Sequence, residues 1–465
     1  MHYPSKSARP FGLNVSLVLA ALLLAGLWIA GGASRADVIG QAICRLLACI
    51  VLAAFTLFGP RGEFRRLGDH RAVLVILLGC IALPLIQLIP LPPTWWLALP
   101  HRAPLTDAAT LTGQPQPWRP WSIVPATTFN AACSLLVPLT TFCLVATLAP
   151  RDHIWLLRLL LALVVASMLV GLVQFSGVDI DNPFINGPGE VNGMFANHNH
   201  FALFIAFGCL LAPAWAFERE DTPRWRAPVA LGLVVLFILT ILASGSRAGM
   251  AAGVIGLGCG LVMIRTDVKR ALRRYPRWVF PALISGTFVV IGALVMLSIA
   301  ADRAMSINRA ISVDISQDMR SRGLPIVLAM INDYFPAGSG LGSFDPIFRM
   351  HEPFALLKPT YFNHAHDDFL EILLDAGLPG LLLLLTALAW WTWASVRAWR
   401  AGPEQEHRLA RLGSVVLVLV FGASIVDYPA RTPMVMAVIV IAAIWLSGHT
   451  KHLGTSALRA APAHL

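Results

Sequence analysis

The sequence predicts an all-α, polytopic membrane protein of about twelve transmembrane helices with one long outer loop. Of its 465 residues, 57% are hydrophobic and only 13% are charged, whereas soluble proteins carry about 25% charged residues. The apolar residues gather in runs of roughly 17–25, which is the length a helix needs to cross a bilayer. Lys and Arg are concentrated in alternate connections between these runs, as the positive-inside rule describes.

The predicted spans are apolar windows separated by polar connections. They lie at residues 13–31, 38–58, 72–90, 129–148, 154–175, 200–217, 228–244, 248–264, 278–300, 378–397, 411–428 and 433–448. The first run follows two basic residues but is long, and the sequence after it is a weak cleavage site. We therefore expect a retained helix and no cleaved signal peptide.

Counting positive charges predicts the orientation. Of the 35 Lys and Arg residues, 23 fall in one set of connections and 11 in the other, while Arg45 lies inside a span. The richer set is expected to be cytoplasmic, which places both termini inside and makes 451–465 a cytoplasmic tail. The outer side then holds the Pro- and Trp-rich loop 91–128 and the long loop 301–366. We divide the chain into N-terminal helices at 1–190 and a second transmembrane unit at 191–450.

Several functions are disfavoured by composition. The formal net charge of +10 does not indicate nucleic acid, because no basic stripe is interleaved with aromatic residues. The seven cysteines lie in apolar runs without a CxxC pair, so we expect free thiols, with no disulfide and no cysteine metal site. A twelve-helix saccharide transporter stays an alternative, but transporters place ionisable residues near the midplane of several helices.

Polar clusters fall at the outer ends of the predicted spans. The stretch 193–202 contains Asn197, His198 and His200, and its asparagines suit a helix cap. Between two spans, Arg247 follows Ser-Gly-Ser at the start of a helix. A helix N-terminus carries partial positive charge, so an added arginine favours an anion there. The alternative is a side chain that snorkels to water.

The long loop contributes two more features. Arg320 and Arg322 precede apolar residues spaced as in a short amphipathic helix. The glycine-rich stretch 338–343 then predicts a turn in which the backbone closely approaches a ligand or another element. It is not a dinucleotide fingerprint, because no strand precedes it.

The stretch 363–371, NHAHDDFLE, gathers ionisable groups where the chain re-enters apolar sequence. Asn363, His364, His366 and Asp367 could form a polar helix cap. In a helix starting near His364 the two histidines diverge by about 200°, which disfavours a shared metal ion. The remaining interpretation is an imidazole general base. Asp367 beside it could raise the pKa of that base.

Two arginines and a histidine on one face suggest transfer from a diphosphate-linked donor. Guanidinium groups bind phosphate oxygens in a bidentate manner and keep their charge. They could stabilise a departing diphosphate without a divalent ion. A lipid-borne donor would explain why these residues lie at the membrane edge.

These residues, in this order, resemble the O-antigen ligase / O-antigen polymerase superfamily of bacterial inner-membrane glycosyltransferases. Its ligase branch carries the pattern H-[NSQ]-x9-G-x2-G, and His366, Asp367, Gly377 and Gly380 fit that spacing, with an aspartate in place of the usual amide or serine. The resemblance spans about residues 190–435. It includes FANHNHFA at 195–202 and IVDYPARTP at 425–433.

Because the residues show no metal signature, we expect no metal or other cofactor. The resemblance implies a twelve-helix fold whose long loop 301–366 covers a periplasmic cavity. The donor would be an undecaprenyl-diphosphate-linked glycan. The acceptor hydroxyl would be on lipid A–core in a ligase, on another lipid-linked glycan in a polymerase, or on Ser or Thr in a protein-glycosylating relative. The functional arginines would be Arg247 and Arg320, with Arg322 as the rival for the second, and His366 would be the base. The substrate-binding residues would be Arg322, Asn363, His364, Asp367, Asn197, His198, His200 and Arg431.

Overall fold

The protein is an almost wholly helical bundle. This computed structural model describes residues 14–59, 61–180, 182–185, 191–218, 223–273, 276, 278, 285, 286, 289, 319–357, 362–402 and 407–459. In the N-terminal half the elements are α1 (Val15–Ala30), α2 (Ile39–Phe58), η1 (Arg61–His70), α3 (Arg71–Gln87), β1 (Pro90–Leu91), α4 (Pro93–Leu97), α5 (Ala103–Leu111), β2 (Arg119–Pro120), α6 (Pro125–Ser134), α7 (Leu136–Ala146) and α8 (Asp152–Phe175).

The second half continues the bundle. Its elements are α9 (His198–Ala216), α10 (Arg226–Ser244), α11 (Arg247–Leu272), α14 (Met319–Tyr334), α15 (Phe344–His351), η3 (Phe354–Leu356), α16 (Asp368–Arg400), α17 (Arg408–Ser424), η5 (Pro429–Arg431) and α18 (Pro433–Arg459). Strand structure in the described residues is limited to the antiparallel pair β1–β2.

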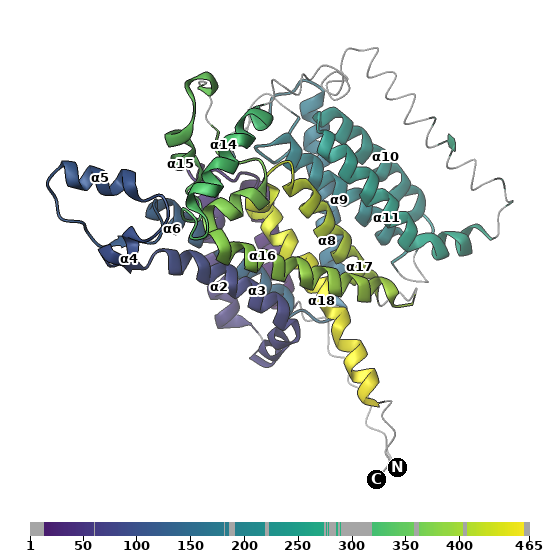
Figure 1. Cartoon of the computed structure of the whole chain (residues 1–465). Coiled ribbons are helices and arrows are strands. Elements are labelled where there is room, and N and C mark those ends of the chain that lie inside the picture. Colours follow the sequence, from purple (N-terminus) through teal and green to yellow (C-terminus); the bar gives the residue numbers. More distant parts are fainter. Residues whose placement is uncertain are drawn as a thin grey trace, which may run out of the picture.

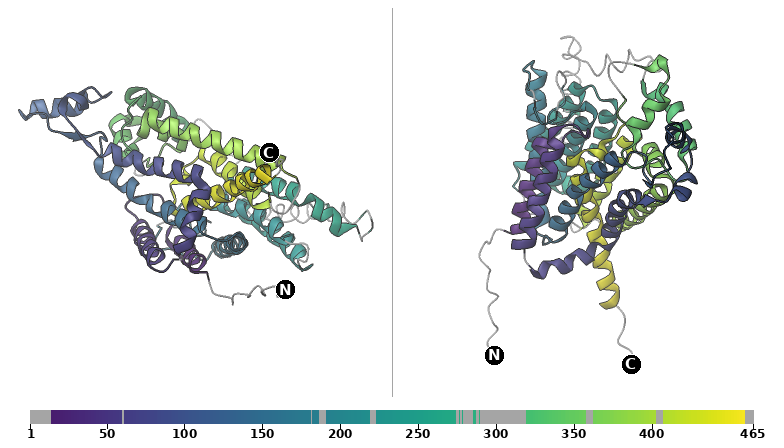
Figure 2. Two further views of the ribbon diagram at one scale, coloured as in Figure 1. Left: turned by 90° about the horizontal axis from the view of Figure 1, so that it is seen from below. Right: turned by 90° about the vertical axis from the view of Figure 1, so that its left-hand side faces the viewer.

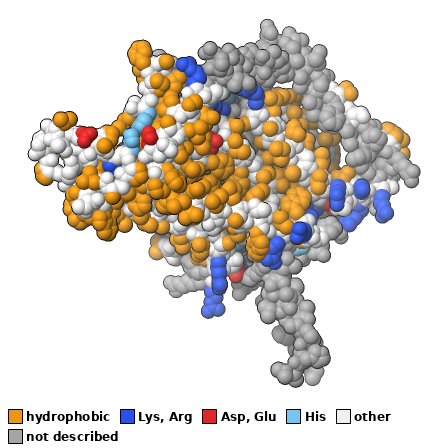
Figure 3. All heavy atoms as spheres, viewed as in Figure 1, with side chains coloured by type: hydrophobic (Ala, Val, Ile, Leu, Met, Phe, Trp, Pro, Cys, Tyr) orange, Lys and Arg blue, Asp and Glu red, His pale blue; other side chains and the backbone are white. Residues whose placement is uncertain are grey.

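The all-α membrane fold is confirmed. Among the described residues, 8 helices are long and apolar enough to cross a bilayer, and two shorter apolar helices accompany them. Every predicted span except 278–300 falls on a helix. That span lies almost entirely outside the described residues, as does the first part of the long loop, 301–318. Hydrophobic side chains cover the middle of the face in Figure 3, and Lys and Arg side chains gather along its lower edge.

Helix α9 is the centre of the bundle. Of its apolar window, 89% is buried, compared with 50% or less for every other candidate span in the described chain. It packs against α8, α10, α11 and α17. Gly208 permits this close packing, because a Cβ there would lie 2.6 Å from the Phe237 ring. The first turn of this central helix is therefore held rigidly in place.

The end of the bundle that carries α14 and α15 is where the polar clusters meet. In Figures 1 and 2 these helices lie together at one end, while α4 and α5 project from the side and α18 projects from the opposite end. The apolar spacing after Arg320 does form a helix, α14, although the helix already begins at Met319. We call this end of the molecule the α14 end.

A kink divides α16. Gly377 has φ 54° and interrupts the helix, and a Cβ at this position would lie 2.2 Å from the carbonyl oxygen of Pro336. The glycine-rich turn closes over the kink, since the N–H groups of Ser339 and Gly340 donate to the carbonyls of Leu374 and Asp375. The expected close backbone approach is therefore confirmed, and the approached element is α16.

Candidate active site

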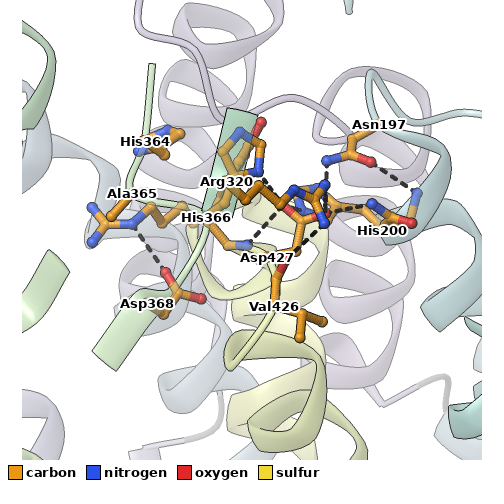
Figure 4. Close-up of polar contacts among 12 residues, drawn as sticks. Asn197, His200, Arg320, His364, Ala365, His366, Asp368, Val426 and Asp427 are labelled. Atoms are coloured by element: carbon orange, nitrogen blue, oxygen red, sulfur yellow. Dashed lines mark hydrogen bonds and ion pairs between the residues drawn. The ribbon is translucent and has the colours of Figure 1, made fainter. Parts of the chain in front are cut away.

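A buried carboxylate, Asp427, organises the polar residues at the α14 end. It lies between α17 and η5, and its side chain is 2% exposed. His366 Nδ1 lies 3.2 Å from Oδ1, and the Tyr428 backbone N–H donates to the same oxygen at 3.0 Å. The side chains of Asn197 and Asn199 donate to Oδ2 at 3.1 and 2.7 Å. We call Asp427 and these partners, with His200 and Arg320 described below, the Asp427 cluster (Figure 4).

The stretch around Asn197 supplies one wall of this cluster. Asn197 caps α9, because its Oδ1 accepts a hydrogen bond from the Asn199 N–H while its Nδ2 reaches Asp427. His200 is 2% exposed, and its Nε2 lies 3.7 Å from Asp427 Oδ1. His198 begins the helix with a half-buried side chain. Capping and site formation are therefore combined in one stretch.

The ionisation of Asp427 defines how His366 is oriented. Burial alone raises the pKa of Asp427, but the approach of the His200 and His366 imidazoles outweighs it and holds this pKa well below its ordinary value. An ionised carboxylate only accepts hydrogen bonds. His366 therefore donates from Nδ1, which leaves the lone pair on Nε2 to accept a proton. This is the arrangement of a general base and its orienting carboxylate.

The backbone at His366 is unusual. Its φ is 53°, a left-handed conformation that few residues other than glycine adopt. Such strain persists where the surrounding structure imposes it, and it is concentrated at functional sites. The helix expected from near His364 begins instead at Asp368, with Asp367 as its N-cap, accepting from the N–H groups of Phe369 and Leu370. The carboxylate that contacts His366 is thus Asp427, and Asp367 caps the helix.

The structure separates the candidate arginines. Arg320 NH1 donates to the Val426 carbonyl at 3.0 Å, and NH2 lies 3.7 Å from Asp427 Oδ2. Its side chain is 37% exposed. Arg322 instead donates to the carbonyl of Ala355 at 3.1 Å. Of the two rivals, Arg320 is the one that joins the Asp427 cluster.

Arg247 is linked to the same cluster through its helix cap. It is the first residue of α11, and its side chain is exposed. The preceding Ser246 accepts from the Gly249 N–H at 2.9 Å and donates to Asn199 Oδ1 at 2.7 Å. Asn199 in turn binds Asp427. The positive end of α11 is thereby fixed beside the site.

A second group of ion pairs lies next to the first. The Arg431 guanidinium contacts Asp368 Oδ1 at 3.0 Å and Glu371 Oε1 at 3.1 Å. Glu371 also contacts His364 Nδ1 at 2.9 Å, and it accepts from the Ala365 N–H at 2.8 Å. Both carboxylates are buried, at 5% and 0% exposure. We call this group the Arg431 cluster.

Tyr428 separates the two clusters. Its ring lies 5.0, 4.3 and 4.9 Å, between centroids, from those of His200, His364 and His366. Burial and the charge of Asp427 raise the pKa of its hydroxyl to about 12, against hydrogen bonds from Asn363 and Asn197 that lower it. The hydroxyl therefore stays protonated at neutral pH. Asn363 thus contacts Tyr428, which lies between the two clusters.

Potential metal ligands converge elsewhere. The two histidines of the HxHDD stretch face different carboxylates, Glu371 and Asp427. Within the described residues, one group of three potential ligand atoms lies within 4.8 Å of one another, from His101, Asp333 and His351. These residues belong to the turn before α5, to α14 and to α15, and none of them is part of the Asp427 or Arg431 cluster.

Sequence reasoning missed the residues that connect the candidates. Asp427 had been noted only as part of a familiar stretch, and Asn199, Glu371 and Tyr428 had no assigned role. The available signal was a carboxylate at the end of an apolar span, because an ionisable residue at that depth indicates function. Nothing in the sequence pairs it with His366, which lies 61 positions earlier.

Comparison with known families finds one match, which covers part of the chain. Residues 232–385 match the family model described as O-antigen ligase. This range contains Arg247, Arg320, His366 and the kink glycine Gly377, and it ends before Asp427. A comparison with curated proteins gives no match. The match supports the resemblance to the O-antigen ligase and polymerase superfamily over residues 232–385, within a multi-pass helical fold.

Proposed function

We propose that this protein transfers a glycan from an undecaprenyl-diphosphate carrier to an acceptor hydroxyl at the α14 end, which faces the periplasm. The protein would lie in the bacterial inner membrane with both termini in the cytoplasm, as the distribution of Lys and Arg favours. The observation that carries the proposal is the His366–Asp427 pair at 3.2 Å, which lies beside Arg320 in a chain whose residues 232–385 match the O-antigen ligase family model.

The chemical step needs a base and a leaving group. His366 Nε2 removes the proton of the acceptor hydroxyl as its oxygen attacks the anomeric carbon of the donor sugar. The bond from that carbon to the diphosphate oxygen breaks, and undecaprenyl diphosphate leaves with the bonding electrons. Asp427 stabilises the imidazolium that forms, and the proton then passes to water or to the released diphosphate.

The arginines supply the positive charge for the leaving group. Arg320 reaches the Asp427 cluster with a side chain that is 37% exposed, so a substrate phosphate can approach its guanidinium. Arg247 lies exposed at the N-terminus of α11. Together they would bind the diphosphate and stabilise the charge that develops on it. No divalent ion enters this step.

Replacing His366 with alanine is the direct test. We expect His366→Ala to lower the transfer rate by about 10²–10⁴-fold, which is the usual contribution of a general base. The measurement is glycan transfer from purified lipid-linked donor by protein in nanodiscs. Full activity in a folded His366→Ala protein would refute the role of the base.

The matched control is His364→Ala. His364 also contacts a carboxylate through Nδ1, but Arg431 already neutralises that carboxylate at 3.1 Å. We expect a loss of about tenfold or less, mainly in KM for the acceptor, because His364 shapes the site without taking the proton. A larger loss in His364→Ala than in His366→Ala would exchange the two assignments.

The acceptor decides between ligase and polymerase. The donor, the base and the arginines serve both reactions equally, so the proposal covers transfer to lipid A–core and, as the alternative, to a second lipid-linked glycan. Incubation with one donor and each acceptor in turn distinguishes them by the mass of the product. Flux of labelled donor without any covalent product would favour transport.

A further inference from the structure

A cavity of about 350 Å³ lies beside the candidate active site. Its walls come from α2, α6, α15, η5 and the segment before α16, and they include Asn363 and His364. Asp427, His366, Arg247 and Arg320 are not among its lining residues. This volume lies at the lower end of the range of ligand pockets, about 300–1,000 Å³. The cavity is therefore adjacent to the reacting groups but distinct from the proposed diphosphate site.

The charges around this cavity do not balance. Of the lining arginines, Arg35 pairs with Asp37, and Arg431 pairs with the carboxylates of its cluster. The lining carboxylate Asp345 pairs with Arg349. Arg45 has no carboxylate partner among the described residues, and its one hydrogen bond is a 3.5 Å contact to Gln41. One positive charge in the cavity is left without a counter-ion.

Arg45 is also incompletely hydrogen-bonded. Its Nε is buried and has no hydrogen-bond partner in the part of the chain that the structure describes. It lies six residues into α2, or about 9 Å from the start of the helix. A charged residue inside a span is costly and usually marks a ligand. A guanidinium with a free edge is matched by phosphate or carboxylate oxygens.

We propose that this cavity is the acceptor subsite and that it binds an anionic group of the acceptor, of the phosphate class, against Arg45. This inference rests on the proposed transfer function, in which the donor diphosphate lies at Arg247 and Arg320. In Figure 4, His364 and Asp368 lie on one side of Asp427, and Asn197 and His200 lie on the other. His364 lines the cavity, and His366 is two positions later in the sequence. An acceptor bound in the cavity would therefore present its hydroxyl to His366 from the side on which His364 lies.

The first test compares acceptors with and without a phosphate group. We expect Arg45→Gln to raise KM for a phosphorylated acceptor by tenfold or more, with kcat and the KM for the lipid-linked donor little changed. For the dephosphorylated acceptor, KM should be the same in Arg45→Gln and in the wild type. An equal rise in KM for both acceptors, or a rise that depends on anionic phospholipid in the nanodisc, would assign the Arg45 charge to the surrounding lipid and overturn the proposal.

A second measurement does not depend on transfer. Binding of glucose 1-phosphate and of glucose to the full-length protein is compared by ligand-observed NMR. Wild type should bind the phosphate at least tenfold more tightly than glucose, Arg45→Lys should keep part of this preference, and Arg45→Gln should lose it. The control is Arg119→Gln, since Arg119 lies in β2, outside the cavity and over the Trp96 ring.

The two measurements separate the possible failures. A protein that binds glucose 1-phosphate through Arg45 but transfers no glycan would contradict the proposed function and retain the anion site. If the wild type transfers glycan and the Arg45→Gln variant binds glucose 1-phosphate as tightly as the wild type does, only the anion site is contradicted. Size-exclusion profiles of each variant confirm that the protein is folded.

Discussion

Two histidine–carboxylate pairs lie side by side in this protein, and they differ in how their charge is satisfied. His364 contacts Glu371, whose carboxylate is also bound by Arg431 at 3.1 Å. His366 contacts Asp427, whose nearest guanidinium, Arg320, is 3.7 Å away. The carboxylate of the first pair is in direct contact with a guanidinium, whereas that of the second is bound closely by amides and imidazoles.

That difference indicates where chemistry can occur. A carboxylate already neutralised by a close arginine stabilises a new imidazolium only weakly, whereas Asp427 retains its charge for this purpose. Arg320 is also more exposed than Arg431, at 37% against 20%. We therefore propose that the Asp427 cluster supplies the base and a solvent-accessible cation for the reaction, while the Arg431 cluster holds α16 and η5 together.

Replacing Asp427 should have the largest effect on catalysis of any residue that does not contact substrate. In Asp427→Asn the amide no longer fixes the Nδ1–H tautomer or stabilises the imidazolium, so kcat should fall about 10²–10⁴-fold with KM little changed. Asp427→Glu should recover part of kcat. Transfer assays over a range of acceptor concentrations measure both parameters.

If Asp427 had only a structural role, Asp427→Asn and Asp427→Glu would both lower the thermal stability of the protein. Both substitutions would then change activity only through the amount of folded protein. Equal kcat per folded molecule in wild type and Asp427→Asn would contradict positioning of the base.

Breaking the Arg431 cluster should act on stability. Arg431→Gln leaves the buried Asp368 and Glu371 without their cation, and removing one partner of a buried pair costs about 3–5 kcal/mol. Thermal unfolding of the detergent-solubilised protein measures the loss. The control is Arg349→Gln, because its pair with Asp345 is exposed and worth about 0–1 kcal/mol. Unchanged stability in Arg431→Gln would show that the cluster does not hold these elements together.

The fold was accessible from the sequence because its signal is local. Apolar runs located the spans, since each helix must be long and hydrophobic whatever it packs against. The glycine turn at 338–343 was recognised for the same reason. The element that this turn contacts was not predicted, because the contact between Gly338 and the kink at Gly377 depends on how two distant segments pack.

The sequence predicted only part of the candidate site. Spacing to the two glycines predicts His366 and the resemblance suggests Arg320, and the structure places both in the Asp427 cluster. The sequence suggests that Asp367, the neighbour of His366, could raise the pKa of the base, but the Asp367 side chain caps α16 instead. The true partner comes from 61 residues away. Adjacency in the chain does not determine side-chain direction where the backbone has a positive φ, as at His366.

The pH dependence of transfer tests the same pair. The pKa of Asp427 lies well below 3.8, so the stability that its ionised form contributes is fully present above the unfolded pKa of about 3.9 and is lost only as pH falls through the lower folded value. Between pH 8 and 5.5 the protein should therefore keep this contribution to stability. A loss of transfer in this window would therefore not come from protonation of Asp427.

A histidine base must be neutral to accept the acceptor proton, so kcat/KM should fall, by up to about tenfold per pH unit, as acid protonates the base. A profile of kcat/KM against pH, recorded alongside thermal stability, provides the measurement. A flat profile from pH 8 to 5.5 would exclude a histidine as the base.

Removing divalent ions should have the smallest effect on transfer. In the proposed step Arg247 and Arg320 carry the charge of the diphosphate, so excess EDTA should leave kcat unchanged. The group of His101, Asp333 and His351 sharpens this test, because its ligand atoms lie within 4.8 Å of one another but outside the Asp427 cluster. EDTA that lowers thermal stability and spares transfer would point to this group, and His101→Ala should then abolish the EDTA effect. Loss of transfer in EDTA that a single divalent ion restores would replace the arginine mechanism with a metal-dependent one.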